Sequence, residues 1–151
     1  DGAGWAAFGA RLDKIGAAFR AAGLDFGWHN HDFEFKALPD GSFPIEHLMA
    51  GGPGLSLELD IAWVARAGVD PLPWIAKYAD RITAAHAKDI APAGEKVDED
   101  GWADIGTGVM NWRELSKALS ATKAKLLVLE HDNPSDDKRF ASASFAAASA
   151  F

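Results

Sequence analysis

The chain has 151 residues, of which 48% are hydrophobic and 25% are charged, and this composition is typical of an ordinary globular domain. Its formal net charge of -7 disfavours nucleic acid as a partner, because an acidic surface repels phosphate backbones. The lack of cysteine excludes disulfides and thiolate zinc sites and is typical of cytoplasmic proteins. No apolar run approaches the roughly 20 residues of a membrane span, so we expect no membrane segment.

The first part of the chain shows a helix–strand–helix–strand pattern. Apolar residues recur at every third or fourth position over Trp5–Ala22, which predicts an amphipathic helix ended by Gly23. The aromatic-rich segment Leu24–Phe35 is then predicted to be a strand. A short helix is expected over Ile45–Ala50, and a second strand over Leu55–Ile61.

The same alternation continues to the end of the chain. The expected elements are a helix over Pro71–Tyr78, a strand over Ile82–Ala87, a long polar loop over Ile90–Thr107, a helix over Trp112–Ala121, a strand over Lys125–Glu130 and an alanine-rich helix over Asp136–Phe151. Strict alternation of this kind predicts an α/β fold, with a parallel sheet and helical crossovers. Both open sheets and (β/α)8 barrels fit it.

Each predicted strand finishes in residues that can bind a metal or move a proton. They are His29, His31 and Glu34 on the first strand, Asp60 on the second, His86 on the third, and Glu130 with His131 on the fourth. The carboxyl ends of barrel strands open on one face, so we expect these side chains to converge there. Three carboxylates and one imidazole suit Mn²⁺, Mg²⁺, Co²⁺ or Zn²⁺. Without a cation the clustered carboxylates would repel one another.

Each of these residues also has a purely structural interpretation. Asp60 could cap the following helix, and His86 could be a hydrogen-bonded core histidine. His29 and His31 share one face of the predicted strand and could each bond a neighbouring loop. Glu130 is harder to explain in this way, because a carboxylate at the end of a buried strand is costly without a partner. The site prediction therefore depends on all four strand ends together.

Five sequence blocks, in this order and spacing, resemble the sugar phosphate isomerase/epimerase family of xylose isomerase-like TIM barrels. The blocks are GWHNHDFEF, LELDIAWVARAGVDP, ITAAHAKD, DIGTGVMNW and LVLEHD, and the resemblance extends over about residues 5–145. Inosose dehydratases, ketose 3-epimerases and hydroxypyruvate isomerases are related to this family. The resemblance makes a barrel the expected form of the parallel fold.

The resemblance also implies a set of site residues. The implied metal ligands are Glu34, Asp60, His86 and Glu130, with His29 or His31 as alternatives to Glu34 at the first position. Two further residues are implied to bind substrate, Trp63 and Lys88. Asp89 either orients Lys88 or simply starts the following loop.

The implied activity is a divalent-metal-dependent isomerisation or epimerisation of a sugar, sugar phosphate or keto-sugar. The metal would stabilise an enediolate. Glu130 would move the proton on one face of the substrate, and Glu34, His29 or His31 would do so on the other. A dehydration of the inosose dehydratase type is the alternative.

A complete (β/α)8 barrel usually needs about 250 residues, and four β/α units account for half of one. We therefore expect residues 1–151 to form the C-terminal half of the barrel. Half a barrel leaves two strand edges and part of its core exposed, so a missing N-terminal half or a homo-oligomer is expected beside it.

Two other functions would also account for part of this pattern. A non-catalytic half-barrel fragment that binds metal or sugar is the main rival. DNA repair of the endonuclease IV type would need more histidines for a multi-zinc cluster and a basic groove. The five histidines and the acidic charge of this chain disfavour it.

Overall fold

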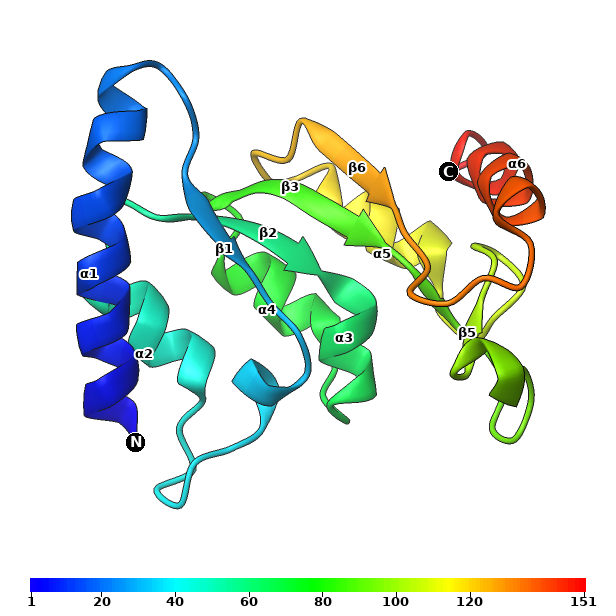
Figure 1. The fold of residues 1–151 in the computed structure, drawn as a ribbon, viewed down its shortest axis with the longest axis horizontal. Coiled ribbons are helices and arrows are strands. Elements are labelled where there is room, and N and C mark those ends of the chain that lie inside the picture. The colour runs from blue at the N-terminus through cyan, green and yellow to red at the C-terminus, as the bar shows by residue number, and fades with distance from the viewer.

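The computed structural model describes residues 1–151 (Figure 1). The helices are α1 (Gly2–Ala21), α2 (Pro44–Gly51), α3 (Ile61–Arg66), α4 (Pro71–Lys77), α5 (Trp112–Leu119) and α6 (Asp137–Ala148), with short 3-10 turns η1 (Phe33–Phe35) and η2 (Val97–Glu99). The strands are β1 (Gly27–His29), β2 (Ser56–Asp60), β3 (Ile82–Ala87), β4 (Asp89–Ile90), β5 (Trp102–Ala103) and β6 (Leu126–Leu129).

Four strands form one sheet in the order β1-β2-β3-β6, and every neighbouring pair is parallel. The expected parallel α/β fold is therefore confirmed. Helical crossovers join the strands, as the alternation in the sequence requires. The sheet does not close on itself, so β1 and β6 each have one edge without a partner strand (Figure 1).

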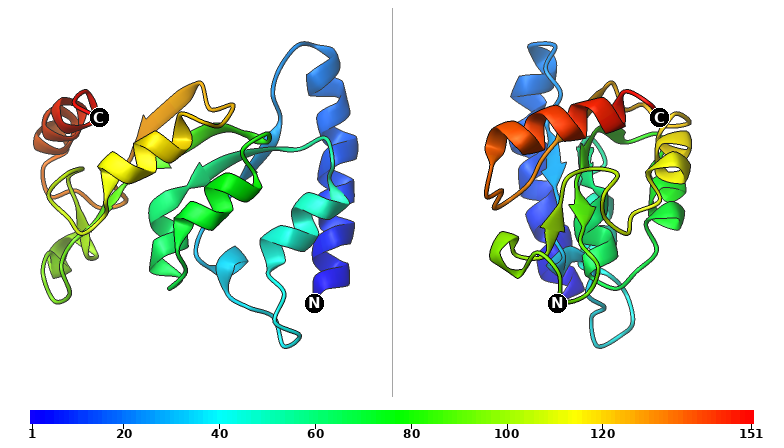
Figure 2. Two further views of the ribbon diagram at one scale, coloured as in Figure 1. Left: turned by 180° about the vertical axis from the view of Figure 1, so that it is seen from behind. Right: turned by 90° about the vertical axis from the view of Figure 1, so that its right-hand side faces the viewer.

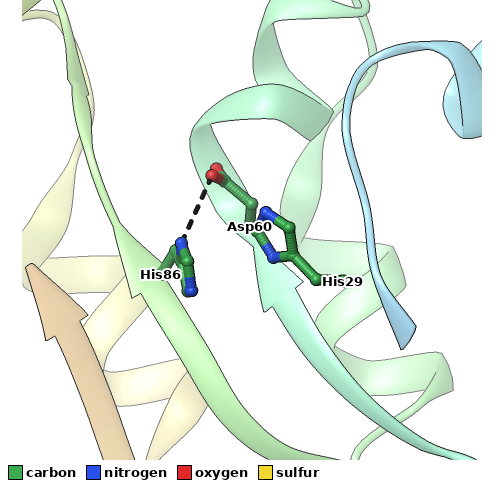
Figure 3. Close-up of side chains that lie close together, drawn as sticks. All are labelled: His29, Asp60 and His86. Carbon is green, nitrogen blue, oxygen red and sulfur yellow. Dashed lines mark ion pairs between the residues drawn. The ribbon is translucent and has the colours of Figure 1, made fainter. Parts of the chain in front are cut away.

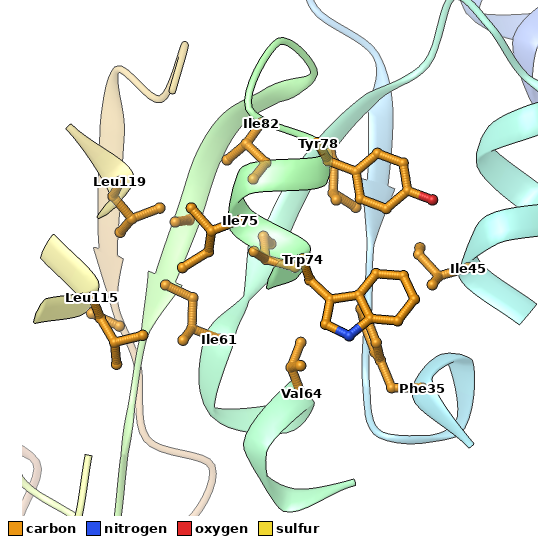
Figure 4. Packing of buried hydrophobic residues seen from close by; sticks show 14 of the residues in the cluster. Phe35, Ile45, Ile61, Val64, Trp74, Ile75, Tyr78, Ile82, Leu115 and Leu119 are labelled. Atoms are coloured by element: carbon orange, nitrogen blue, oxygen red, sulfur yellow. The ribbon is translucent and has the colours of Figure 1, made fainter. Parts of the chain in front are cut away.

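The hydrophobic core lies on one face of the sheet only. Buried side chains of β2 and β3, such as Leu57, Leu59 and Ile82, pack against apolar residues of α2, α4 and α5 (Figure 4). Figure 2 (left) shows α4 and α5 lying over the strands when the molecule is seen from behind, and no helix lies over the strands on the face turned to the viewer in Figure 1. This one-sided core is what a segment of a barrel wall should have, because the other face of the wall lines the barrel interior.

Helix α1 packs less deeply than its sequence pattern predicts. Ile15 and Phe19 of the expected apolar face remain 49% and 43% exposed. The contact with α2 is made through glycines instead, since a Cβ on Gly9 would lie 2.1 Å from the carbonyl oxygen of Leu48. Glycines allow the two backbones to approach closely, so the apolar stripe is only partly used.

The expected first strand, Leu24–Phe35, is wrong over most of its length. Only Gly27–His29 pairs with β2, and Phe33–Phe35 forms a 3-10 turn. The chain leaves the sheet at Asn30, whose side chain is fully buried. Its amide group exchanges hydrogen bonds with the backbone of Asp60, at 3.0 and 3.1 Å. The Asn30 side chain thus makes the hydrogen bonds that the next backbone pair between β1 and β2 would otherwise make, so the backbone of β1 can turn away from the sheet.

Two further elements were not predicted. Helix α3 starts directly after Asp60. The antiparallel hairpin β4–β5 begins at Asp89 and otherwise lies within the polar segment Ile90–Thr107. Arg66 of α3 donates a hydrogen bond to the Asp100 carbonyl and lies 3.8 Å from the centre of the Trp102 ring. These contacts fix the hairpin near the carboxyl end of the sheet. No helix has the length and hydrophobicity needed to cross a bilayer.

Candidate metal centre

Three neighbouring strands bring His29, Asp60 and His86 together at the carboxyl end of the sheet (Figure 3). Asp60 pairs with His86 in the register of β2 and β3, and His29 pairs with Glu58 in that of β1 and β2. One potential ligand atom from each of the three residues lies within 4.8 Å of the others. This spacing fits a single ion bound between them.

Asp60 combines the two roles weighed from the sequence. Its Oδ1 accepts a hydrogen bond from the Trp63 backbone N–H at 2.9 Å, which caps α3. Its Oδ2 is buried and accepts no hydrogen bond, although Lys88 Nζ lies 3.4 Å away. Burial raises the pKa of the Asp60 carboxyl, and the nearby Lys88 ammonium only partly opposes this. One oxygen is therefore structural, and the other is free for a cation.

His29 is held so that it can act as a neutral ligand. Its Nδ1 lies 3.3 Å from the Glu58 carbonyl oxygen, and its ring lies 4.2 Å from that of His86. Burial, followed by the proximity of His86, lowers the pKa of His29. A lowered pKa favours the neutral imidazole, which is the form that binds metals.

His86 lies between two carboxylates. Its Nδ1 is 2.8 Å from Glu130 Oε2, and its Nε2 is 2.8 Å from Glu58 Oε1. A neutral imidazole has one N–H and one lone pair, so it can satisfy only one of these two acceptors. An additional proton or a metal ion is needed to make both contacts favourable.

Lys88 is fully buried and completes the polar cluster. Its ammonium lies 2.8 Å from Asp132, 3.0 Å from Glu130 and 3.4 Å from Asp60. Burial lowers the pKa of Lys88, but the attraction of these carboxylates outweighs it and the pKa is raised. The Trp102 ring covers the ammonium at 4.6 Å and the Trp63 ring lies 5.2 Å from it. The two implied substrate residues are thus neighbours at the site.

Glu130 contacts both His86 and Lys88. Burial would raise the pKa of the Glu130 carboxyl, but its hydrogen bonds with these two side chains hold the pKa below its ordinary value. The side chain of Glu130 is 35% exposed, so it can be reached from the open face of the sheet.

The structure does not bring Glu34 into this cluster. Its two carboxylate oxygens accept hydrogen bonds from Trp28 Nε1 at 2.7 Å and from the His31 backbone N–H at 2.9 Å. Burial raises the pKa of the Glu34 carboxyl. The His31 ring lies at the border of the site, 5.2 Å from His29 and 5.4 Å from Trp63. At the first position of the implied ligand set, His29 rather than Glu34 therefore lies beside Asp60 and His86.

Two site residues were not anticipated from the sequence, Glu58 and Asp132. Glu58 precedes Asp60 by two positions, and Asp132 follows Glu130 by two. Residues two apart in a strand point to the same face, so the period of two in LELD is a signal for Glu58. Asp132 lies beyond the end of β6, where the strand period gives no such signal.

Asp89 does not contact Lys88 through its side chain but organises the following loop. Its carboxylate accepts hydrogen bonds from the backbone N–H groups of Ile90, Gly106, Gly108 and Met110. Burial raises the pKa of Asp89, and these four bonds oppose that effect. Asp89 therefore starts and organises the following loop and does not orient Lys88.

The charges of the cluster fit a divalent cation. Three carboxylates (Asp60, Glu130 and Asp132) lie within 3.4 Å of the Lys88 ammonium, and a fourth, that of Glu58, contacts His86. One lysine cannot neutralise so many carboxylates, and like charges at short distance destabilise one another. The orphaned Asp60 Oδ2 and the doubly contacted His86 are the atoms that an ion would satisfy. Oxygen and imidazole donors suit Mn²⁺, Co²⁺, Mg²⁺ or Zn²⁺.

The fold and the position of the cluster define part of a parallel (β/α) barrel with its candidate site at the carboxyl ends of the strands. The chain belongs to the family of xylose isomerase-like TIM barrels, which matches residues 1–148. This confirms the family that the sequence blocks indicated. No curated protein sequence is significantly similar to the chain.

Three similar solved structures illustrate the relationship. A sugar phosphate isomerase/epimerase from Parabacteroides distasonis has a TM-score of 0.74 at 21% identity, over 96% of this chain and 50% of its own. The probable 3-DHS dehydratase AsbF from Bacillus anthracis, involved in petrobactin synthesis, has a TM-score of 0.71 at 20% identity. The match covers 90% of this chain and 53% of AsbF. An L-ribulose 3-epimerase has a TM-score of 0.57 at 19% identity, and the match covers 93% of this chain and 46% of the epimerase. The chain thus spans about half the length of these proteins.

Proposed function

We propose that this chain supplies the metal-binding half of a divalent-metal-dependent sugar isomerase or epimerase. The observation that carries the proposal is Asp60 Oδ2, a fully buried carboxylate oxygen without a hydrogen bond that lies in a group with His29 and His86. A buried carboxylate oxygen without a hydrogen bond is costly, and the Lys88 ammonium 3.4 Å away is shared with Glu130 and Asp132. The similar structures include an epimerase and a probable dehydratase, which supports chemistry of this class.

The proposed ligands are His29, Asp60 and His86, with Glu130 as the fourth. This set keeps three residues of the implied quartet and takes His29 in place of Glu34, whose two oxygens already accept hydrogen bonds. Glu58 is a further carboxylate within reach of His86 and orients its ring. Such second partners of ligand histidines fix both the tautomer and the ring orientation.

When bound, the metal supplies a Lewis acid that stabilises negative charge on the oxygens of a hydroxy-carbonyl substrate. The chain itself provides the groups that move protons. Glu130 can accept a proton from the carbon beside the carbonyl, since its lowered pKa keeps it ionised and its side chain is partly exposed. Lys88 holds Glu130 in place and, with its raised pKa, remains a hydrogen-bond donor.

The outcome of proton removal depends on where the proton returns. Return to the neighbouring carbon gives isomerisation, return to the opposite face of the same carbon gives epimerisation, and loss of a β-hydroxyl gives dehydration. His31, at the border of the site beside Trp63, is the candidate second base. Loss of both the proton beside the carbonyl and the β-hydroxyl, together one molecule of water, would identify the dehydratase.

Removal of the metal is expected to abolish activity. Exhaustive treatment with EDTA should remove solvent-proton exchange into a ketose substrate, and Mn²⁺ or Co²⁺ should restore it. The measurement is NMR-detected exchange in D₂O, made on the chain under conditions where its assembly state is known. Full activity after prolonged chelation would rule out the metal-dependent mechanism.

We also propose that the open face of the sheet is completed by another half barrel, either an N-terminal half or a second copy of this chain. The two free strand edges and the exposed Leu126, at 59%, support this. Unpaired edges of a sheet readily add further strands. For residues 1–151 alone we expect self-association at micromolar concentration, measured by sedimentation velocity. A stable monomer under those conditions contradicts this part of the proposal.

A further inference from the structure

We infer that the candidate site accepts an uncharged hydroxy-carbonyl compound rather than a phosphate ester, and that Asp89 sets this preference by filling the anion-binding loop of this face. The inference rests on the proposed function, which leaves sugar and sugar phosphate both open. Its basis is that the backbone N–H groups and the cationic side chains of the loops at the carboxyl ends of the strands already have hydrogen-bond or ion-pair partners within the chain.

The Gly106–Met110 loop has the features of a phosphate cradle. It follows β3, which is the seventh strand if the chain is the C-terminal half, and the loops after the seventh and eighth strands often bind phosphate in TIM barrels. It contains two glycines, and Gly106 has a positive φ of 85°. Successive N–H groups in such turns form concave anion sites.

Asp89 occupies that cradle from within the chain. Its Oδ2 accepts the N–H groups of Gly106 at 2.9 Å and Gly108 at 3.3 Å, and its Oδ1 accepts that of Met110 at 3.0 Å. The side chain is fully buried. A Cβ on Gly108 would lie 2.2 Å from Asp89 Oδ1, so the loop closes tightly on the carboxylate. The carboxylate stands where an oxygen of a bound anion would otherwise be.

The remaining N–H groups of this loop are used as well. Thr107 donates to the Asp104 carbonyl at 3.0 Å, and Val109 donates to the Ile90 carbonyl at 2.8 Å. Every N–H group from Gly106 to Met110 therefore has an internal acceptor, and none is free for a phosphate oxygen.

Charge in the loops points the same way. Three loop segments follow strands at this end of the sheet, and none of them contains an arginine. Segment 30–43 after β1 has three acidic residues and one lysine, and segment 88–111 after β3 has six acidic residues and two lysines. Segment 130–136 after β6 has three acidic residues and no lysine. Each of those lysines is paired: Lys36 with Asp32, Lys88 with the carboxylates described above, and Lys96 with Glu99. Arg139, which reaches in from α6, is bound by Glu99 and Asp104. A dianionic phosphate would meet net negative charge here.

Inorganic phosphate is the direct probe of the loop. We expect the ¹H–¹⁵N signals of Gly106 and Gly108 in the wild-type chain to show no saturable shift with phosphate. Saturable shifts with a dissociation constant below about 1 mM overturn the inference. The titration is made with the metal-free chain, so that phosphate does not bind through an added metal.

Removal of the Asp89 carboxylate tests its assigned role. In Asp89→Ala the vacated cradle is expected to bind formate, so that the melting temperature rises with formate concentration. Asp70→Ala is the control, because Asp70 also accepts a backbone N–H, that of Leu72 at 2.9 Å, but has no cationic partner that its removal would free to bind formate. Equal responses of the two variants to formate contradict the assignment, and the wild-type titration decides the inference if Asp89→Ala does not fold.

Substrate preference is compared with D-xylulose and D-xylulose 5-phosphate in the presence of Mn²⁺. The uncharged ketose is expected to exchange its C–H protons with D₂O at least about tenfold faster, equal to about 1.4 kcal/mol. Faster exchange of the phosphate ester overturns the inference. If neither ketose exchanges, the proposed function fails on its own, and the phosphate titration still tests the role of the loop.

Discussion

Replacing Asp60 with asparagine is expected to weaken Mn²⁺ binding by at least about 100-fold while the chain stays folded. Asparagine is an equally good helix N-cap, so Oδ1 can still accept the hydrogen bond from the Trp63 N–H. The lost feature is the negative charge on the buried, unpartnered Oδ2. Isothermal titration calorimetry with Mn²⁺ measures the affinity, and circular dichroism measures the retained fold.

Asp70→Asn is the matched control for this variant. Asp70 caps α4 through the Leu72 N–H at 2.9 Å and has no place in the polar cluster. Its substitution should leave Mn²⁺ affinity unchanged. Equal Mn²⁺ affinity in Asp60→Asn and the wild type would show that Asp60 is not a metal ligand and would contradict the proposed metal centre.

The second large effect is expected for Lys88→Met, which should lower the free energy of unfolding by about 3–5 kcal/mol in the absence of metal. The substitution removes the only ammonium group among three close carboxylates and leaves buried negative charge uncompensated. It also removes the cation that the Trp102 ring covers. Urea denaturation followed by circular dichroism gives the free energy directly.

Lys77→Met provides the comparison with a surface ion pair. Lys77 pairs with Glu46 in a solvent-exposed position, where such pairs contribute no more than about 1 kcal/mol. Mn²⁺ should stabilise Lys88→Met more than it stabilises Lys77→Met, because a bound cation compensates the same carboxylates. A loss below 1 kcal/mol in Lys88→Met would show that the carboxylates do not depend on this lysine.

The sequence was sufficient for the architecture because the relevant signals are local. Short apolar runs such as LSLEL and KLLVL, separated by helical periodicity and glycine or proline breaks, set the order of strands and helices. Strict alternation then leaves few topologies other than a parallel sheet with crossovers. The positions of Asp60, His86 and Glu130 followed from the same reasoning, since each stands at or near the end of an apolar strand.

The misplaced elements have a different origin. The first strand ends early because Asn30 bonds the backbone of Asp60, a residue 30 positions away in the sequence. The aromatic content of Leu24–Phe35 could not reveal that contact. In the same way, α3 begins where Asp60 caps it, and its six residues are too few to give a clear helical period.

The sequence by itself therefore determined the (β/α) order, the acidic character of the chain and the strand ends at which polar side chains would gather, because all three depend on residues close together in the chain. Only the tertiary structure decided which of those side chains meet. It placed His29 rather than Glu34 beside Asp60, and it joined Lys88 to Asp132 across 44 positions. Such choices depend on long-range hydrogen bonds and on competition for buried charge, and neither is encoded in local periodicity.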